Sequence, residues 1–309
     1  MKPAAFAYHR AHDVADAVGL LSDLAGRGRE PKAIAGGQSL MPMMSFRLAR
    51  PSDLVDLGRL RDLPGMTDIA HAGSALAVGA MTTHRQVELA RLGPGFAVLS
   101  EAMRYVGHLP IRSRGTVGGS LVHGDATAEW CMLALLLDAV IVAEGPNGRR
   151  EIPAGEMFYG FYATAVEADE VVTEIRFTRA APKAALTEFS RRAGDFATVA
   201  AAVSLEARAD GSLEGGRVVL GGVAPAPLRI PEAEAVLADG APGPELFAEC
   251  GRAAAEAIEP RSDAQGSADY RRALTRTLVA RSLGQAWEKG TSGSEAAAAG
   301  GQGWQGGGR

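Results

Sequence analysis

The stretch Thr116-Val117-Gly118-Gly119-Ser120-Leu121 is the most informative part of this chain. An earlier stretch, Gly36-Gly37-Gln38-Ser39-Leu40, has the same character, because both place paired glycines and then a serine after a short apolar run. Glycine has no Cβ, so its backbone adopts conformations that other residues avoid and lets neighbouring groups come close. The two stretches therefore predict two backbone loops whose main-chain N–H groups are open to a ligand.

Length and composition indicate a folded protein of about two domains. The chain has 309 residues, of which 47% are hydrophobic and 22% are charged. Its net charge is -4 at pH 7 and its Lys and Arg residues are scattered, so no nucleic-acid partner is expected. The apolar stretch from Trp130 to Ala143 contains Asp138 and is too short to span a bilayer. We therefore expect no membrane span.

The N-terminus and the cysteines predict a cytoplasmic location. Met1-Lys2-Pro3 leads into a polar segment with no apolar stretch of the kind that a signal peptide needs. Cys131 and Cys250 lie in apolar helical contexts, which favours reduced thiols and leaves a disulfide between them open.

Hydrophobic periodicity predicts an N-terminal domain over residues 1–177, made of two α/β subdomains. The first subdomain, about residues 1–58, has a helix capped by Asp13 and strands near 32–35 and 54–57. The second, residues 59–177, carries strands near 75–80, 139–143 and 171–177, and helices at 96–106 and from Gly124 onward. In that last helix, Asp125 and Glu129 are spaced i, i+4, which predicts that both lie on one helix face.

The texture changes after Phe177 and predicts a C-terminal α+β domain over residues 178–288. Three strands followed by three helices are expected there, at 187–192, 198–207, 213–221, 231–237, 244–258 and 267–287. Residues 289–309 consist largely of Gly, Ala, Ser and Gln with a lone Trp304, which predicts a disordered tail.

Several familiar sites are missing from the sequence. It contains no G-x-G-x-x-G after a strand, no phosphate loop ending in Gly-Lys-Ser/Thr, no H-E-x-x-H, no paired C-x-x-C and no G-x-S-x-G. The histidines, at 9, 12, 71, 84, 108 and 123, do not cluster at ligand spacing. A Rossmann enzyme, a zinc enzyme and a hydrolase are therefore disfavoured, and no metal site is expected on this chain.

The paired glycines then remain as the candidate site. Successive backbone N–H groups in a turn bind diphosphates well, and Ser39 and Ser120 would add hydroxyl donors. A nearby carboxylate accepts hydrogen bonds from sugar hydroxyls, a role open to Asp125 and Glu129. The competing interpretation makes the glycines simple tight turns and the carboxylates partners of a helix dipole. Spacing alone does not decide between the two.

Four motifs in order resemble a known family. They are AGGQSLMPMMSFRLARPSDLVDL, AVGAMTTH, IRSRGTVGGSLVHGDATAE and RRAGDFATVAAAV. Their order and spacing resemble the FAD-binding medium subunit of carbon monoxide dehydrogenase and of other molybdenum hydroxylases, the module that forms the flavin domain of xanthine dehydrogenase. The resemblance covers nearly all of residues 1–287. It implies a fold similar to p-cresol methylhydroxylase, an α+β protein in which two α/β subdomains hold FAD and a C-terminal α+β domain follows.

The resemblance also implies which residues bind FAD. Two segments are expected around the diphosphate: Ala35, Gly36, Gly37, Gln38 and Ser39, and then Thr116, Val117, Gly118, Gly119 and Ser120. Glu129 matches an acidic position for the FAD sugar moiety, where many relatives have Asp. Phe196 matches a tyrosine that lies against the isoalloxazine, so the ring is kept and the hydroxyl is lost; its alternative is an ordinary core residue.

The family further implies a division of labour between chains. A large subunit with the molybdenum cofactor oxidises the substrate, and a small subunit with 2Fe-2S clusters passes electrons to FAD on the medium subunit, in a heterotrimer or its dimer. FAD then reduces an external acceptor, and no side chain of this chain need act as a catalytic acid or base. Two alternatives stay open: a stand-alone FAD-dependent oxidoreductase of the same fold, and an assembly module that has lost its flavin.

Overall fold

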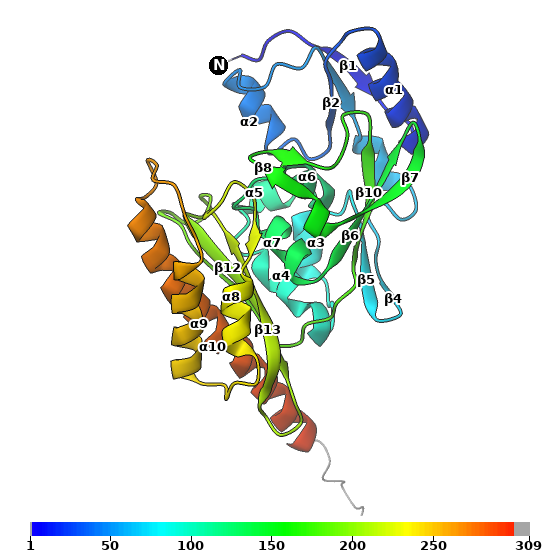
Figure 1. The fold of residues 1–309 in the computed structure, drawn as a ribbon. Helices are drawn as coiled ribbons and strands as arrows, with labels where there is room; N and C mark the ends of the chain where they lie inside the picture. Colours follow the sequence, from blue (N-terminus) through cyan, green and yellow to red (C-terminus); the bar gives the residue numbers. More distant parts are fainter. Residues whose placement is uncertain (1, 300–309) are drawn as a thin grey trace, which may run out of the picture.

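The computed structural model describes residues 2–299, with side chains described for residues 2–289. Figure 1 shows three parts: a small N-terminal unit, a central unit, and a C-terminal sheet covered by three long segments of helix. Each part is built on its own sheet, and the candidate site residues lie on segments of all three.

The N-terminal unit is a three-stranded parallel sheet with the strand order β1-β3-β2. Its strands are β1 (Ala7–Arg10), β2 (Pro31–Ile34) and β3 (Asp53–Asp56). Helix α1 (Val14–Gly26) connects β1 to β2 and begins at Asp13, whose side chain accepts a hydrogen bond from the Asp16 N–H at 2.8 Å. The short helix α2 (Leu40–Ser45) and the 3-10 turn η1 (Gly58–Asp62) follow β2 and β3. Strand β1 lacked a sequence signal because its residues are largely exposed.

The central unit is a five-stranded sheet in the order β4-β5-β10-β6-β7, with antiparallel neighbours. Its strands are β4 (Ile69–Ala72), β5 (Ala75–Gly79), β6 (Ala139–Gly145), β7 (Gly148–Pro153) and β10 (Val171–Phe177). The helices are α3 (His84–Leu89), α4 (Ala97–Ala102), α5 (Leu109–Arg112), α6 (Val117–His123) and α7 (Glu129–Leu136). Smaller elements are η2 (Pro94–Phe96), η3 (Ala154–Glu156), β8 (Phe158–Gly160) and β9 (Ala163–Thr164).

One local prediction in this unit is wrong. Gly124 adopts a left-handed conformation, with φ of 64°, and ends α6. The Asp125 carboxylate then accepts hydrogen bonds from the Thr127 N–H at 2.8 Å and from its hydroxyl at 2.7 Å, which holds a turn. Helix α7 begins only at Glu129. Asp125 and Glu129 therefore do not share a helix face, because the side chain of Asp125 stabilises the turn between two helices.

The C-terminal domain is an antiparallel sheet in the order β11-β12-β13-β14. The three expected strands are β11 (Ala184–Phe189), β12 (Val199–Ala207) and β13 (Leu213–Gly221), and the two-residue β14 (Leu228–Arg229) extends the edge. Helices α8 (Pro231–Leu237), α9 (Pro244–Glu256) and α10 (Ala268–Ala299) cover one face (Figure 1). Helix α10 extends beyond the predicted end at 287 to Ala299, into the first part of the segment predicted as a disordered tail; residues 296–299 are alanines, which favour helix. Residues 300–309, with Trp304, lie outside the described residues.

The two domains share a core, because strand alternation in the C-terminal sheet divides its side chains between two partners. Ala184, Leu186 and Ala200 pack into the apolar cluster that contains Trp130 and Leu133 of the N-terminal domain. The residues between them pack against the C-terminal helices; Ala185, Val199 and Ala201 are examples. The sheet therefore closes the interior of the N-terminal domain with one face and builds its own domain with the other.

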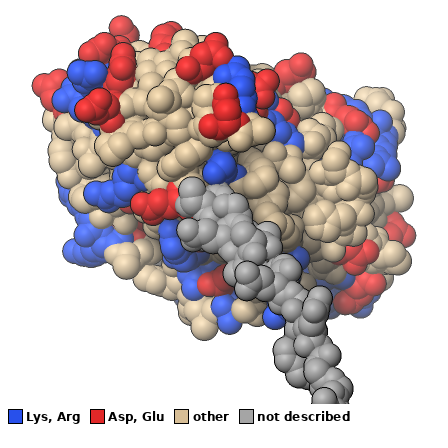
Figure 2. Space-filling view, turned by 90° about the horizontal axis from the view of Figure 1, so that it is seen from below, with Lys and Arg blue, Asp and Glu red and all other residues tan. Residues whose placement is uncertain are grey.

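The face shown in Figure 2 agrees with the scattered charges of the sequence. On the face shown in Figure 2, Lys and Arg side chains lie among Asp and Glu side chains and do not form a continuous stripe. Within residues 2–299, no helix has the length and apolar character needed to cross a membrane. Cys131 and Cys250 are both free and buried.

Candidate functional site

The first glycine motif is an open turn between β2 and α2. Gly37 has φ of 72°, a left-handed conformation that favours glycine. The main-chain N–H groups of Gly37, Gln38 and Ser39 make no hydrogen bond within residues 2–299, while the Gln38 side-chain amide donates to the Gly36 carbonyl at 3.0 Å. Three successive N–H groups are thus left free for a ligand, as the sequence predicted.

The second glycine motif is a helix N-terminus instead of an open loop. Thr116 caps α6 by accepting a hydrogen bond from the Gly119 N–H at 3.1 Å. The Val117 N–H donates to the Thr82 carbonyl and the Gly118 N–H to the Ala80 carbonyl, both at 2.9 Å. The prediction of open N–H groups at this motif is therefore wrong, because they donate to Thr116 and to the carbonyls of Thr82 and Ala80. Its glycines instead permit close packing.

Close packing brings the two glycine motifs side by side. A Cβ on Gly36 would lie 2.2 Å from the carbonyl oxygen of Arg114, so only glycine fits where the first motif crosses the segment before α6. A Cβ on Gly119 would lie 3.9 Å from the Cβ of Ala35, and Gly119 is itself exposed. The exposed start of α6 therefore borders the free N–H groups of the first motif.

His84 makes two hydrogen bonds beside the second glycine motif. The Trp130 indole N–H donates to His84 Nδ1 at 3.0 Å, and the His84 main-chain N–H donates to the Gly115 carbonyl at 3.1 Å. Burial lowers the pKa of His84 to about 4, so the ring is neutral at pH 7 and accepts that hydrogen bond. His84 therefore connects two segments: its ring binds Trp130, the residue after Glu129, and its main-chain N–H binds Gly115, which leads into the second motif.

Two carboxyl groups meet at the border of the two domains. Glu129 is the first residue of α7, and burial raises its pKa to about 7. Glu188 lies on β11, and burial together with the negative charge of Glu129 raises its pKa to about 8. The Oε2 atom of Glu188 is buried and has no hydrogen-bond partner among the described residues. Sequence reasoning missed Glu188. The available signal was its place two residues after Leu186 and four after Ala184, which puts a charged residue on the buried face of the strand.

Phe196 lies on the loop between β11 and β12, and 63% of its surface is exposed. This loop crosses to the N-terminal domain, because Gly194, with φ of 83°, packs directly on the ring of His108. A Cβ on Gly194 would lie 2.3 Å from that ring. His108 immediately precedes α5, whose end leads into Arg114 and the contact with Gly36. The loop that carries Phe196 is thus connected to both glycine motifs, and its exposure argues against the alternative of a core residue.

A second group of side chains borders α6 and was also missed from the sequence. His123 lies one helical turn after Gly119, and its ring centroid is 4.9 Å from that of Tyr162 in the β8–β9 hairpin. Tyr162 has φ of 55°, which is unusual for a bulky residue. Partial burial and then the negative charge of Asp125 raise the pKa of Tyr162. His123 and Tyr162 thus place two further polar side chains at the end of α6.

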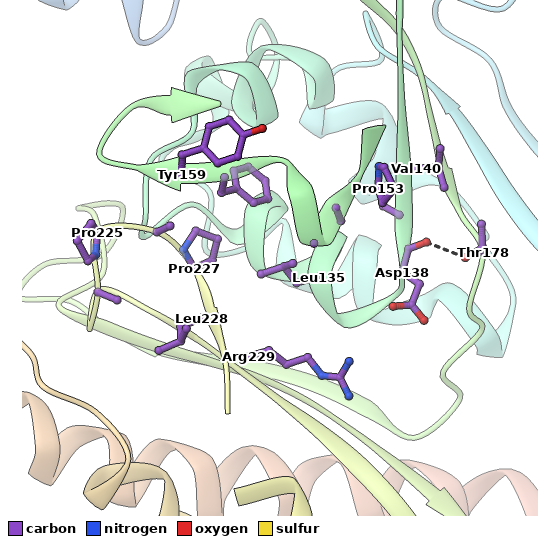
Figure 3. A pocket seen from close by; sticks show the side chains of 16 residues that line it. Leu135, Asp138, Val140, Pro153, Tyr159, Thr178, Pro225, Pro227, Leu228 and Arg229 are labelled. Carbon is purple, nitrogen blue, oxygen red and sulfur yellow. Dashed lines mark hydrogen bonds between the residues drawn. The ribbon is translucent and has the colours of Figure 1, made fainter. Parts of the chain in front are cut away.

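Figure 3 shows a pocket of about 680 Å³ in another part of the molecule. It lies between the β8 region and the segment before β14, and Tyr159, Pro225, Pro227 and Arg229 are among its lining residues. None of the residues predicted to bind a cofactor lines it. Within the described residues, no group of three or more His, Cys, Asp or Glu side chains is placed to hold a metal ion.

Two family models match the chain. Residues 4–179 match the FAD binding domain in molybdopterin dehydrogenase, and residues 184–286 match the CO dehydrogenase flavoprotein C-terminal domain. The chain belongs to the FAD-binding medium subunits of the molybdenum hydroxylase family. As a member, it is an oxidoreductase subunit whose cofactor is FAD.

The match to named relatives extends over almost the whole length of this chain and of each relative. The chain is 38% identical over 290 residues to the 6-hydroxypseudooxynicotine dehydrogenase complex subunit alpha of Paenarthrobacter nicotinovorans, covering 93% of this chain and 96% of that protein. It is 36% identical over 296 residues to the carbon monoxide dehydrogenase medium chain of Hydrogenophaga pseudoflava, covering 94% and 99%.

Solved structures of the family confirm the predicted fold class. Carbon monoxide dehydrogenase from Hydrogenophaga pseudoflava matches with a TM-score of 0.87 and 37% identity, covering 94% of this chain and 99% of that one. Quinoline 2-oxidoreductase from Pseudomonas putida 86 matches with a TM-score of 0.87 and 32% identity, covering 93% and 99%. The FAD-binding medium subunit is thus an FAD-binding domain followed by a C-terminal α+β domain.

The side chains and backbone of this medium subunit fit FAD. The free N–H groups of Gly37, Gln38 and Ser39 suit a diphosphate, which accepts hydrogen bonds and carries negative charge. The carboxyls of Glu129 and Glu188 have no ion-pair partner among the described residues, and they suit the hydroxyl and N–H donors of the same cofactor.

We expect the FAD-free medium subunit to lose thermal stability between pH 6.5 and pH 8. Folded Glu188 keeps its proton to about pH 8, whereas the unfolded side chain loses it near 4.5, so stability begins to fall above about pH 4.5 and continues to fall through this window. Glu129 acts in the same direction up to about pH 7, and Asp125 reinforces it. His84 opposes this trend only below about 6.5.

The measurement compares melting temperatures of wild type and the Glu188→Gln variant across this window. Wild type should lose about 3 °C relative to the variant, from a slope of about 1.4 kcal/mol per pH unit reduced by partial solvent access. Parallel curves for the two proteins would contradict the assigned raised pKa of Glu188.

Proposed function

We propose that this chain is the electron-transfer subunit of a molybdenum hydroxylase complex, placed between an iron-sulfur subunit and an external acceptor. Partner chains would carry the molybdenum cofactor and the 2Fe-2S clusters, in a heterotrimer or its dimer. The observation that supports it most is the set of free N–H groups at residues 37–39, packed beside α6 in a chain that matches medium subunits along 96% to 99% of their length.

The residues of this chain would bind and orient the cofactor. Bound FAD would supply the redox chemistry, accepting electrons and passing them on. Gly37, Gln38 and Ser39 would donate main-chain hydrogen bonds to the diphosphate, and the exposed Gly119 would leave room for it beside α6. Glu129 would accept a hydrogen bond from a sugar hydroxyl, and Phe196 would offer an apolar ring on a loop anchored at His108.

Substrate selection is not assigned to this chain. Relatives with 36% identity are named for different substrates, as in nicotine 6-hydroxylase and carbon monoxide dehydrogenase. Medium subunits that are equally similar to this chain are thus named for different substrates. We infer that the pocket that selects the substrate lies on a partner chain.

Cofactor binding tests the first part of the proposal. The full chain expressed alone should be yellow or become so after addition of FAD, and mass spectrometry of the released flavin should identify FAD. A folded protein that stays colourless after reconstitution would contradict the assignment.

The place of the subunit in a complex needs a separate experiment. Co-expression with the genes that neighbour its own should give a complex that contains iron, sulfide and molybdenum. Steady-state turnover of a substrate by the purified single chain would instead support a stand-alone oxidoreductase, and a stable complex without flavin would support an assembly module.

A further inference from the structure

Glu188 occupies an unusual place on β11. Side chains along this strand alternate between two partners. Thr187 faces the C-terminal helices, where its hydroxyl lies 2.6 Å from that of Ser282. Ala184 and Leu186 face the core of the N-terminal domain. Glu188 continues their row and is therefore a carboxyl directed at the other domain.

One oxygen of this carboxyl has no hydrogen-bond partner in the described protein. Its Oε2 atom is buried without a hydrogen-bond partner, and neither Glu188 nor its neighbour Glu129 takes part in an ion pair among the described residues. Buried polar atoms in native proteins nearly always have a partner, and an unsatisfied one costs stability. Glu188 is also the last but one residue of β11, before the loop that carries Phe196 and contacts His108 through Gly194. The missing partner is therefore expected on the candidate cofactor side of β11.

We propose that Glu188 is a further FAD-binding residue, whose carboxyl accepts a hydrogen bond from a donor in the flavin half of the cofactor. The donor would be a ribityl hydroxyl or the ring N3–H, both of which are N–H or O–H groups without charge. The inference rests on the proposed function, because it takes FAD as the ligand of this site. It adds a C-terminal residue to a site otherwise defined by the glycine motifs and Glu129.

The protonation state of Glu188 agrees with this role. A carboxyl that keeps its proton to about pH 8 carries no charge into a buried site at pH 7, yet its carbonyl oxygen still accepts a hydrogen bond. Glutamine has the same shape and also retains a carbonyl acceptor. Leucine has a similar volume but carries no hydrogen-bond acceptor. The pair of variants therefore separates the hydrogen bond from the space that the side chain fills.

The test measures FAD affinity and FAD-free stability on the full chain. Wild type, Glu188→Leu and Glu188→Gln are stripped of flavin and titrated with FAD at pH 7.5, with flavin fluorescence as the readout. We expect the Leu variant to bind at least tenfold more weakly and the Gln variant to stay within about threefold of wild type. Without FAD, both variants should melt at or above the wild-type temperature, because each removes an unsatisfied buried carboxyl. A purely structural side chain would lower the melting temperature on replacement.

Controls separate the possible failures. Glu214→Leu changes an exposed carboxylate of β13 and should leave FAD affinity unchanged. If wild type itself fails to bind FAD, the proposed function fails; if wild type binds and both Glu188 variants bind equally well, only the role of Glu188 is overturned. A Gln variant as weak as the Leu variant would also overturn it. FAD methylated at N3 identifies the donor: the difference between wild type and Leu persists for a ribityl hydroxyl and vanishes for N3–H.

Discussion

Replacement of Gly36 by valine is expected to abolish FAD retention. The new Cβ would lie 2.2 Å from the carbonyl oxygen of Arg114 and 2.8 Å from the Cα of Gly115, which are backbone atoms that no side-chain rotation can move. The first motif must then move away from the start of α6, and the free N–H groups of residues 37–39 move with it. We expect FAD affinity to fall at least a hundredfold and the free energy of unfolding to fall by about 3 kcal/mol.

Gly19→Ala is the matched control for this change. Gly19 lies inside α1, is exposed, and has no atom within 4 Å of a Cβ placed on it. Alanine there should stabilise the protein by about 0.5 to 1 kcal/mol and leave FAD affinity unchanged. The readouts are bound flavin per chain and chemical denaturation of the FAD-free proteins. A folded Gly36→Val protein with wild-type flavin content would contradict the close approach of the two motifs.

Arg271→Met is expected to have the largest effect on the C-terminal domain. The buried guanidinium of Arg271 donates to the carbonyls of Thr198 and Gly222 and makes a two-pronged contact with Asp263, both N–O distances being 2.7 Å. Methionine fills similar space but leaves two carbonyls without a donor. We expect unfolding free energy to fall by about 3 kcal/mol, and the loop that ends at Thr198 to lose its anchor. FAD affinity should fall as well, because Phe196 lies on that loop.

Arg272 offers a control one residue away. Its side chain is 39% exposed, against a buried Arg271, and it pairs with Asp269, which is 95% exposed, so Arg272→Met should change unfolding free energy by less than about 0.5 kcal/mol. Urea denaturation of the two variants provides the comparison. Equal stability of Arg271→Met and Arg272→Met would show that the buried hydrogen bonds do not hold this loop.

The sequence predicted which segments form the site better than it predicted what their glycines and N–H groups contact. The glycine of the first motif was expected where backbone comes close to another group, and Gly36 does so, against Arg114. The paired glycines of the second motif gave the same signal, yet Thr116 caps a helix and the N–H groups are satisfied. Paired glycines indicate close approach, and sequence does not distinguish approach to a ligand from approach to protein.

Other features depend on contacts between distant segments. The prediction that Asp125 lies on a helix face with Glu129 was wrong, because Gly124 adopts a left-handed conformation and ends the helix before it. Hydrophobic periodicity does not reveal such a conformation. The environment of Glu188 depends on Glu129 from the other domain, and that of Tyr162 on the ring of His123. Local patterns fix which face of a strand or helix is buried, but they do not say which segment covers it.

The core shared by the two domains has a consequence for biosynthesis. Ala184, Leu186 and Ala200 complete the apolar cluster around α7, so the N-terminal domain has an open interior until the segment from residue 184 to residue 200 has been translated and has docked. Glu188 and Phe196 arrive with that same segment. We therefore expect stable flavin binding only after this segment has docked, and we expect a chain that ends before it to expose apolar surface to chaperones.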